Sequence, residues 1–462
     1  MQHHTPRTLL SQPIAGTESD DPASALPPVH RASTIFLPTL AQLKSADWRN
    51  RSQPPYGRDG CRAACELETR LARIEGAQQA LVVSSGLAAY ALICMSLLSP
   101  GDVVAMPANG YGTAQQMLRN VFHRFGIGIA LYDPMVPDTW SDAIPASTRL
   151  LCVEAPGSVT MEVPDLRRLA RFAGERGCIA AIDNTYSAGL HLRAFELGFH
   201  VSIQALTKLQ SGGADLVMGS VASAREDISR SLYETRHFLG MHVSPDDIYL
   251  VLRGLPTLSL RYAANTEASL RLAEWFSEKQ EIAAVMHPAF CGSQGHDHWK
   301  RYFTSSTSLF SIAFDAAVET EKIEAFLEAL TLFHFGFSWE VRQAWSCSTA
   351  RRTNPRGSLQ KDIPGLAALR GSGSAWKTGP IWRPTYSTPG HRPSARSGPA
   401  IELHRHRATG SAEHTQHEAG RHEQRAGQPH AGHFLLQEDG TEEGSEYDAC
   451  LAQCRNQRGL AP

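Results

Sequence analysis

Val201-Ser-Ile-Gln-Ala-Leu-Thr-Lys208 is an apolar stretch that ends in a single lysine. Upstream of it, Cys178-Ile-Ala-Ala-Ile-Asp183-Asn-Thr185 is another apolar stretch, and it ends in a single carboxylate. Short continuous apolar runs are typical of strands that are buried on both faces of a parallel sheet. Ligands bind at the carboxyl ends of the strands in such sheets. We therefore expect Asp183 and Lys208 to lie close together in a ligand site.

The stretches around these two residues alternate between strand-like and helix-like patterns. Further strand-like runs cover residues 80–84, 102–106, 127–132 and 149–154. Residues 66–75 instead carry apolar side chains at 67, 71 and 74, the spacing of an amphipathic helix. This alternation predicts βαβ units and an α/β fold with a mostly parallel sheet.

Composition limits the classes of function. The chain has 462 residues and a net charge of −2, which is typical neither of nucleic-acid binding nor of a protein drawn to a membrane surface. No apolar run is long enough to span a bilayer, and no secretory signal is evident at the N-terminus. Nine scattered cysteines indicate reduced thiols and a cytoplasmic location. Cys61-x3-Cys65, Cys450-x3-Cys454 and His404-x-His406 do not form a recognised ligand set, so we expect no metal site.

The sequence divides into four parts. Residues 1–55 form a proline-punctuated arm, 56–245 a large α/β domain, and 246–340 the beginning of a second, α+β domain. Residues 341–462 contain only 13 Leu, Ile, Val and Phe residues, about 11% of this segment. This fraction is below the roughly 20% that a chain needs to build a core. We therefore expect a disordered or aberrant tail.

The pairing of a strand-end lysine with a strand-end aspartate points to pyridoxal 5′-phosphate (PLP). A lysine amine can form a Schiff base with the cofactor aldehyde. An aspartate can keep the pyridine nitrogen protonated, so that the ring acts as an electron sink. The alternative for Lys208 is a solvent-exposed lysine at a strand end, but the paired Asp183 favours the cofactor.

Three weaker motifs fit the same cofactor. Ser84-Ser-Gly86-Leu87 follows a strand and opens a helix, so its backbone N–H groups could bind a phosphate; it could also be only a tight turn. Arg58, in Tyr56-Gly-Arg58, could bind a phosphate bidentately or be a solvated surface group. Tyr111 could stack on a planar ring or simply cover the core.

These motifs, in this order, resemble those of the PLP-dependent Cys/Met metabolism (trans-sulfuration) enzymes, close to the bacterial cystathionine β-lyases. The resemblance covers residues 27–339 and implies the aspartate aminotransferase-like fold (fold type I). It implies that Lys208 carries the cofactor, with Tyr111 stacking on the ring, Asp183 on the pyridine nitrogen, and Thr207 with the Gly86-Leu87 turn on the phosphate. Tyr56 and Arg58 would reach the phosphate of a neighbouring subunit. Ser338 and Trp339 would line the substrate site.

The implied activity is α,β-elimination of L-cystathionine to homocysteine, pyruvate and ammonia, with Lys208 or Tyr111 taking the α-proton. The implied assembly is a homotetramer of dimers with shared active sites. Other chemistries of the same family, γ-synthase, γ-lyase or sulfhydrylase, are the alternatives. A sulfur amino acid is the expected small-molecule partner, with no nucleic acid and no membrane.

One departure from the family pattern is large. After Trp339 the expected Gly-Gly and the rest of the C-terminal domain, including the arginine that clamps the substrate carboxylate, do not follow. A reading-frame shift near codon 340 would give such an arginine- and histidine-rich segment, and the product could be catalytically impaired. The competing interpretation is a natural disordered or interaction segment.

Overall fold

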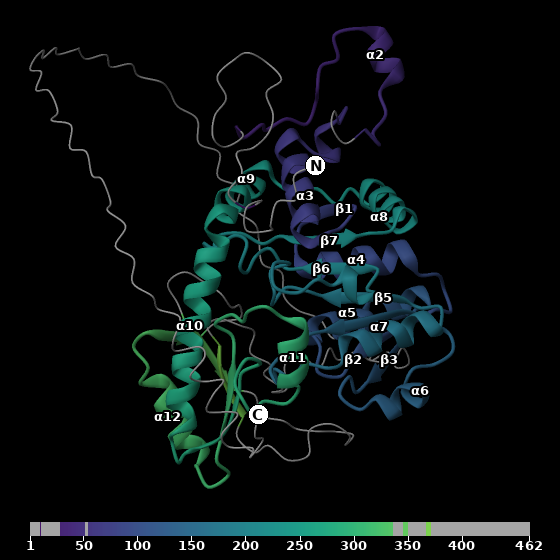
Figure 1. Cartoon of the computed structure of the whole chain (residues 1–462). Helices are drawn as coiled ribbons and strands as arrows, with labels where there is room; N and C mark the ends of the chain where they lie inside the picture. The colour runs from purple at the N-terminus through teal and green to yellow at the C-terminus, as the bar shows by residue number, and fades with distance from the viewer. Residues whose placement is uncertain (1–9, 11–27, 51–53, 336–344, 350–365, 371–462) are drawn as a thin grey trace, which may run out of the picture. The chain divides into compact units, whose positions relative to one another are not determined.

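The computed structural model describes residue 10 and residues 28–50, 54–335, 345–349 and 366–370 (Figure 1). Contacts divide the chain into two units, Met1–Gly379 and Pro380–Pro462, and every described residue lies in the first. Within the described part of the chain, no helix combines the length and the apolar character that crossing a membrane requires.

A seven-stranded sheet contains the two apolar stretches as neighbouring strands. Its order is β1-β7-β6-β5-β4-β2-β3. The strands are β1 (Gln79–Val83), β2 (Val103–Pro107), β3 (Gly128–Tyr132), β4 (Thr148–Glu154), β5 (Ile179–Asp183), β6 (Val201–Gln204) and β7 (Gly219–Ser223). Strands β2 to β6 pair in parallel, and β7 is antiparallel to both β1 and β6. The predicted mostly parallel sheet is therefore confirmed.

Strand β7 was not predicted from the sequence. Its residues, Gly219-Ser-Val-Ala-Ser223, are all buried but include only one branched apolar side chain. Glycine is required at its first position because a Cβ atom at Gly219 would lie 2.3 Å from the carbonyl oxygen of Ser85. A close approach of backbone to backbone therefore replaces the usual apolar signal of a strand.

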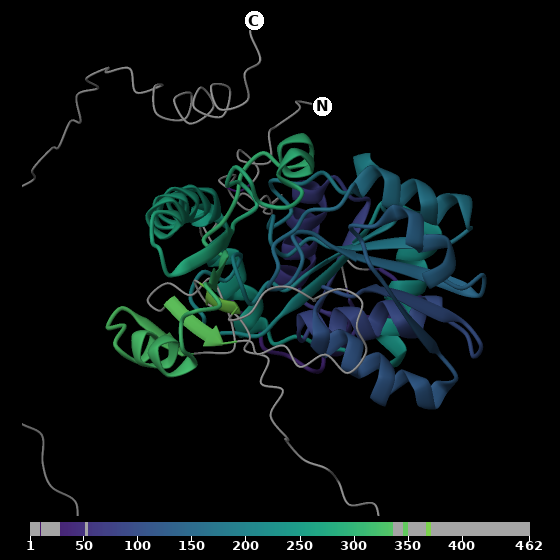
Figure 2. The same cartoon turned by 90° about the horizontal axis from the view of Figure 1, so that it is seen from below.

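Helices cover both faces of this sheet (Figures 1 and 2). On one face pack α4 (Gly86–Leu97), α5 (Gly112–Asn120) and α8 (Glu226–Phe238). On the other pack α3 (Arg62–Glu75), α6 (Trp140–Ala143), α7 (Leu166–Glu175) and α9 (Pro245–Gly254). Strand β5 shows why its run is apolar throughout. Ile179 and Ala181 pack in the cluster with α4, whereas Ala180 and Ile182 pack in the cluster with α7.

A five-stranded sheet follows, in the order β10-β11-β12-β9-β8. Its strands are β8 (Ile282–Met286), β9 (Ser311–Phe314), β10 (Phe333–Phe335), β11 (Trp345–Thr349) and β12 (Leu366–Arg370). The helices of this region are α10 (Leu258–Ser277), α11 (His296–Tyr302) and α12 (Thr320–Glu328). Ala273 and Phe276 of α10 pack with Ile312 of β9 and Leu327 of α12 to form a separate apolar core.

Strands β11 and β12 lie beyond residue 340, inside the segment predicted to be a low-hydrophobicity tail. Strand β11 pairs in parallel with β10, and β12 pairs antiparallel with β11 and β9. The rest of that segment lies outside the described residues. The predicted domain boundaries at 55, 245 and 340 stay predictions.

Glu75, the last residue of α3, has a buried carboxyl group. It accepts hydrogen bonds from Asn184 Nδ2, at 3.3 Å, and from the Ser202 hydroxyl. Burial raises the pKa of Glu75, and the bonds from Ser202, Gln204 and Asn184 oppose that rise only in part. The neutral acid is therefore favoured in the folded chain more than in the unfolded chain.

Replacing Glu75 by Gln removes this titration. A folded-state pKa above the unfolded value gives stability that is present at low pH and lost as the pH rises through the folded value. We therefore expect the free energy of unfolding of Glu75→Gln, relative to wild type, to improve between pH 4.5 and 7 by about 1.4 kcal/mol for each unit of pKa elevation. Urea unfolding across this range is the measurement. Glu175→Gln, at an exposed helix end, is the control, and a pH-independent difference for Glu75→Gln would contradict the expectation.

Candidate active site

A cavity lies at the carboxyl ends of β4, β5 and β6, where segments that are distant in the sequence meet. Six residues predicted from the sequence line it: Gly86, Leu87, Tyr111, Asp183, Thr207 and Lys208. Because parallel strands end at the same edge of a sheet, the polar residues that follow them come together there.

Asp183 ends β5, directly opposite Glu154 at the end of β4. Its Oδ1 accepts from the Thr185 backbone N–H at 3.0 Å, and its Oδ2 accepts from the Tyr90 hydroxyl at 3.2 Å. Burial raises the pKa of Asp183, while the bonds from Thr185 and Tyr90 and the charge of Lys208 act in the opposite direction. The structure thus holds a carboxyl group that a further cation nearby would help to ionise.

Lys208 lies in a tight turn after β6. Its backbone N–H donates to Ala205 O at 3.1 Å, and the Ser211 hydroxyl donates to Lys208 O at 3.2 Å. Thr207 fixes the same turn to the start of β7. Its hydroxyl donates to Met218 O at 3.1 Å and accepts from Met218 N–H at 3.0 Å. Donation from this hydroxyl to a phosphate would therefore replace the bond to Met218 O.

The turn at Ser85 and Gly86 packs tightly against the lysine segment. Ser85 caps α4, its hydroxyl accepting from Ala88 N–H at 2.9 Å. A Cβ atom at Gly86 would lie 2.9 Å from the Cβ of Ala205, closer than real side chains approach. The glycine therefore lets the first turn of α4 approach the loop that carries Lys208, with the positive end of the helix dipole at the cavity.

Tyr111 lies at the start of α5, on the wall of the cavity. Its backbone N–H donates to Glu154 Oε2, and the Ser158 hydroxyl donates to Glu154 Oε1. Glu154, at the end of β4, thus fixes the backbone of Tyr111 at the start of α5.

Sequence reasoning missed Tyr90 and Glu154 as site residues, although signals for both were present. Tyr90 lies one helical turn after Gly86, which places both on the same face of α4. Glu154 is a carboxylate at the end of a strand-like run, the same pattern that identified Asp183.

The segment after β4 also lines the cavity, and its backbone is strained. Val159 and Met161, both lining residues, have φ angles of 76° and 57°. A β-branched valine rarely adopts this left-handed conformation. Strain of this kind concentrates at sites where the surrounding structure holds a loop in place for a ligand.

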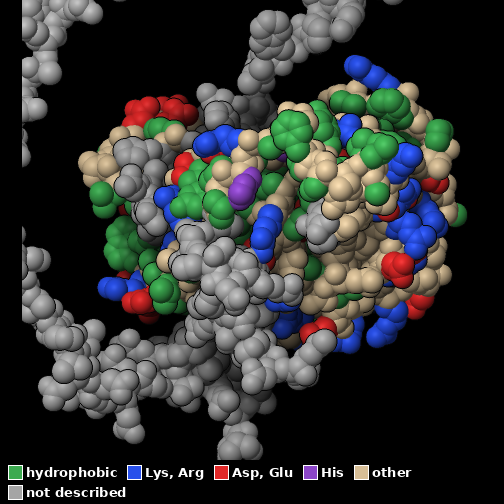
Figure 3. Space-filling model, turned by 90° about the horizontal axis from the view of Figure 1, so that it is seen from above, with side chains coloured by type: hydrophobic (Ala, Val, Ile, Leu, Met, Phe, Trp, Pro, Cys, Tyr) green, Lys and Arg blue, Asp and Glu red, His purple; other side chains and the backbone are tan. Residues whose placement is uncertain are grey.

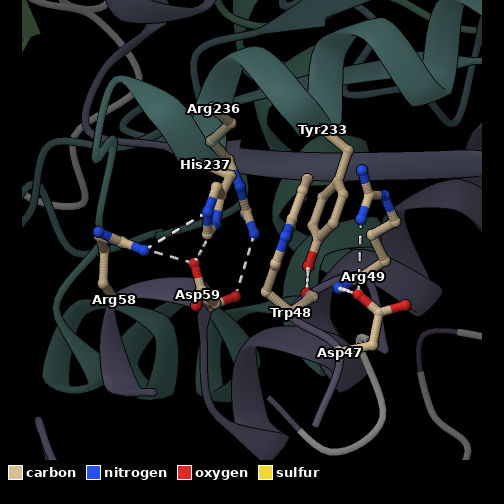
Figure 4. Close-up of polar contacts among 8 residues, drawn as sticks. All are labelled: Asp47, Trp48, Arg49, Arg58, Asp59, Tyr233, Arg236 and His237. Atoms are coloured by element: carbon tan, nitrogen blue, oxygen red, sulfur yellow. Dashed lines mark hydrogen bonds and ion pairs between the residues drawn. The ribbon is translucent and has the colours of Figure 1, made fainter. Parts of the chain in front are cut away.

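Two predicted residues, Tyr56 and Arg58, do not line this cavity. Tyr56 and Arg58 lie at the short 3-10 helix η1 (Gly57–Asp59), and the guanidinium of Arg58 contacts Asp59 and His237 instead (Figure 4). Within one chain they are therefore not part of the cavity lining. Ser338 and Trp339 lie outside the described residues.

The cavity residues fit pyridoxal phosphate. Lys208 offers an amine, the half-buried carboxyl group of Asp183 would be matched by a protonated ring nitrogen, and the Gly86 turn, which has no room for a Cβ atom beside Ala205, offers backbone N–H groups. Among the described residues, no three His, Cys, Asp or Glu side chains are grouped so that they could hold a metal ion.

Comparison with known proteins agrees with this chemistry. A sequence profile of the Cys/Met metabolism PLP-dependent enzymes matches residues 12–344. The cystathionine beta-lyase of Bordetella avium is 34% identical over 339 residues, covering 72% of this chain and 84% of the relative. Cystathionine beta-lyase MetC of Escherichia coli K12 is 33% identical over 318 residues, covering 67% and 79%.

One further relative is named for a different activity, and one solved structure shares the fold. The L-alanine/L-glutamate racemase of Wolbachia pipientis is 29% identical over 357 residues, covering 75% of this chain and 88% of the relative. The crystal structure of MetB from Corynebacterium glutamicum superposes with a TM-score of 0.68 at 23% identity, covering 74% of this chain and 86% of that one. The latter similarity establishes the fold.

Removing the Tyr90 hydroxyl tests the link from α4 to Asp183. Because the bond from Tyr90 lowers the pKa of Asp183, Tyr90→Phe should raise that pKa. The loss of PLP affinity on acidification should then begin at a higher pH than in the wild type. PLP titrations of the apoprotein between pH 5 and 8 measure this shift. Tyr132→Phe removes another buried hydroxyl, bonded to Cys152 O at 2.7 Å, and should leave this pH unchanged. Equal profiles for Tyr90→Phe and wild type would show that the bond has no effect on Asp183.

Filling the space at Gly86 tests the turn. In Gly86→Ala the new methyl group must displace Ala205 and with it the turn that carries Lys208, so we expect PLP affinity to fall about tenfold, or about 1.4 kcal/mol. The matched control is Gly174→Ala on α7, where a Cβ atom meets nothing within 4 Å. Fluorescence titration with PLP measures both variants. Wild-type affinity in Gly86→Ala would mean that the close packing does not serve the cofactor.

Proposed function

This chain belongs to the family of Cys/Met metabolism PLP-dependent enzymes, and we propose that it is a carbon–sulfur lyase that cleaves L-cystathionine to homocysteine, pyruvate and ammonia. The observation that carries the proposal is the meeting of Lys208 and Asp183 in one cavity. The names of the bacterial relatives support cystathionine as the substrate.

Lys208 would hold the cofactor through its amine, and Asp183 would keep the ring nitrogen protonated. When bound, pyridoxal phosphate supplies a conjugated ring that withdraws electrons from the substrate α-carbon. The half-buried position of Asp183 suits this role, because a charge pair shielded from water attracts more strongly than one in water. The Tyr90 hydroxyl and the Thr185 N–H direct the carboxylate by occupying one oxygen each.

Proton transfer falls to Lys208 and Tyr111. Lys208 Nζ would take the α-proton of the substrate, and the Tyr111 hydroxyl is the second candidate. The electron pair of the broken C–H bond would allow the β-thiolate to leave, and this thiolate would gain a proton to give homocysteine. With one water, the remaining three-carbon fragment would give pyruvate and ammonia. Tyr111 would also stack on the ring, with its backbone held by Glu154.

The phosphate would be bound by the N–H groups of the Gly86-Leu87 turn and by Thr207. Tyr56 and Arg58 of a neighbouring subunit would complete its binding, which requires a homo-oligomer of shared-site dimers. The exposed N-terminal arm supports association. Its helix α2 (Leu40–Ser45) buries none of its residues, and Phe36 and Leu40 are 93% and 64% exposed. Figure 3 shows apolar side chains exposed on the face seen from above, the side on which α2 is drawn in Figure 1.

Ser338 and Trp339 remain the proposed substrate contacts. A cytoplasmic location belongs to the same proposal. It is supported by the free thiols of six described cysteines: Cys61, Cys65, Cys94, Cys152, Cys178 and Cys291.

Products distinguish the proposal from other activities. L-Cystathionine should yield pyruvate, detected with lactate dehydrogenase, and thiol, detected with Ellman's reagent, in equal amounts. A γ-lyase would instead release 2-oxobutyrate from cystathionine. A racemase, the activity named for one relative, would convert L-alanine to its D-form without releasing a thiol. Binding of PLP without any of these products would identify a catalytically impaired chain.

Attachment of the cofactor is tested separately. With PLP the full chain should give an absorbance band at about 420 nm, a general property of PLP bound to lysine, and borohydride should trap the cofactor on Lys208. Lys208→Ala should lose both the trapped adduct and lyase turnover, whereas Lys300→Ala, on the exposed side of α11, should keep both. A folded wild-type chain without the band, or trapping on another lysine, would overturn the assignment.

A further inference from the structure

His237, near the end of α8, joins Arg58 to a buried carboxylate (Figure 4). Its Nδ1 lies 2.6 Å from Asp59 Oδ1. The side chains of Asp59 and His237 are 3% and 11% exposed, so this contact is almost completely shielded from water. Arg58 Nη2 lies 3.5 Å from His237 Nε2, and Arg58 Nε lies 3.5 Å from Asp59 Oδ1.

The chemistry of the three groups fixes the direction of each contact. A carboxylate only accepts hydrogen bonds, so His237 Nδ1 carries the proton that faces Asp59. In the neutral ring, Nε2 is then an acceptor, and a guanidinium has only donors to offer it. Asp59 therefore sets the tautomer of His237 that can hold Arg58, much as a buried carboxylate orients a histidine in other polar relays.

The N-terminal arm contacts the flat face of the His237 ring through Trp48. The Trp48 ring stacks on His237 with centroids 3.9 Å apart and an interplanar angle of 14°. The Tyr233 hydroxyl donates to Trp48 O, and the Arg49 guanidinium lies 4.2 Å from the centre of the Trp48 ring. The imidazole is thus held in its plane as well as at its Nδ1 atom.

Arg58 itself is only partly enclosed. Its side chain is 44% exposed, and its Cζ lies 5.6 Å from the centre of the Tyr56 ring. An arginine has five N–H donors, and the two contacts with His237 and Asp59 leave others for a ligand. The cluster therefore restricts where the guanidinium lies without using up its capacity to bind an anion.

We propose that His237 is a positioning residue for PLP binding: it holds Arg58 in the orientation in which that guanidinium meets the cofactor phosphate of a neighbouring subunit. Asp59 sets the tautomer of His237, and Trp48 fixes its ring. This inference rests on the proposed function, which assigns Arg58 to the phosphate.

The test compares apoprotein affinity for PLP with affinity for pyridoxal, which lacks the phosphate, in the full-length chain. His237→Phe keeps an aromatic ring for Trp48 but loses both nitrogens. We expect its preference for PLP over pyridoxal to fall about tenfold, as for loss of a charge-assisted contact, with affinity for pyridoxal unchanged. His237→Gln, which keeps a donor and an acceptor, should retain part of the preference. His123→Phe, at an exposed histidine, is the matched control.

Arg58→Ala separates the assignment of Arg58 to the phosphate from the positioning role of His237. If Arg58→Ala leaves the preference unchanged, the assignment of Arg58 to the phosphate is wrong. If Arg58→Ala lowers it but His237→Phe does not, the positioning role of His237 is wrong. In the expected case the double variant loses no more than Arg58→Ala alone, because both changes remove the same interaction. An equal fall in affinity for pyridoxal would show that His237 acts only on the fold.

Discussion

The half-buried carboxyl group of Asp183 is the constraint around which the site is built. Its place at the end of β5 is set by the parallel pairing with β4 and β6, and burial raises its pKa. Two donors, the Tyr90 hydroxyl and the Thr185 N–H, make the ionised form accessible. A carboxylate in such a position is costly unless a positive charge accompanies it. The fold therefore brings Lys208 into the same cavity, and a cationic cofactor ring would add the matching charge.

The sequence predicted most of the larger sheet and the two central site residues, Asp183 and Lys208, because both predictions depend on local patterns. Six of its seven strands coincide with strand-like runs in the sequence, and Asp183 and Lys208 follow directly from where two of those runs end. The antiparallel strand β7 was missed because its residues are mostly small, with a glycine where it packs against Ser85, and small residues resemble a loop. Beyond residue 340 the low apolar content gave no sign of β11 and β12.

Contacts between distant segments could not be predicted in the same way. The Glu154 bond to Tyr111 joins residues whose proximity depends on the register of β4 against its neighbours. The Asp59–His237 pair joins residues 178 positions apart, and no motif pointed to His237. The positions of Tyr56 and Arg58, away from the cavity of their own chain, likewise follow from the fold of η1 against α8 rather than from their spacing in the sequence.

The insertion of β7 between β1 and β6 has a consequence for biosynthesis. The turn that follows β1 and the lysine that follows β6 are not on adjacent strands, and β7 joins them only after residue 223 has left the ribosome. Pairings between such distant segments form late and leave strand edges exposed meanwhile. A nascent chain that ends before β7 therefore carries both halves of the site but has no sheet that joins them. The sheet that joins the two halves of the site is therefore complete only after this five-residue strand has been made.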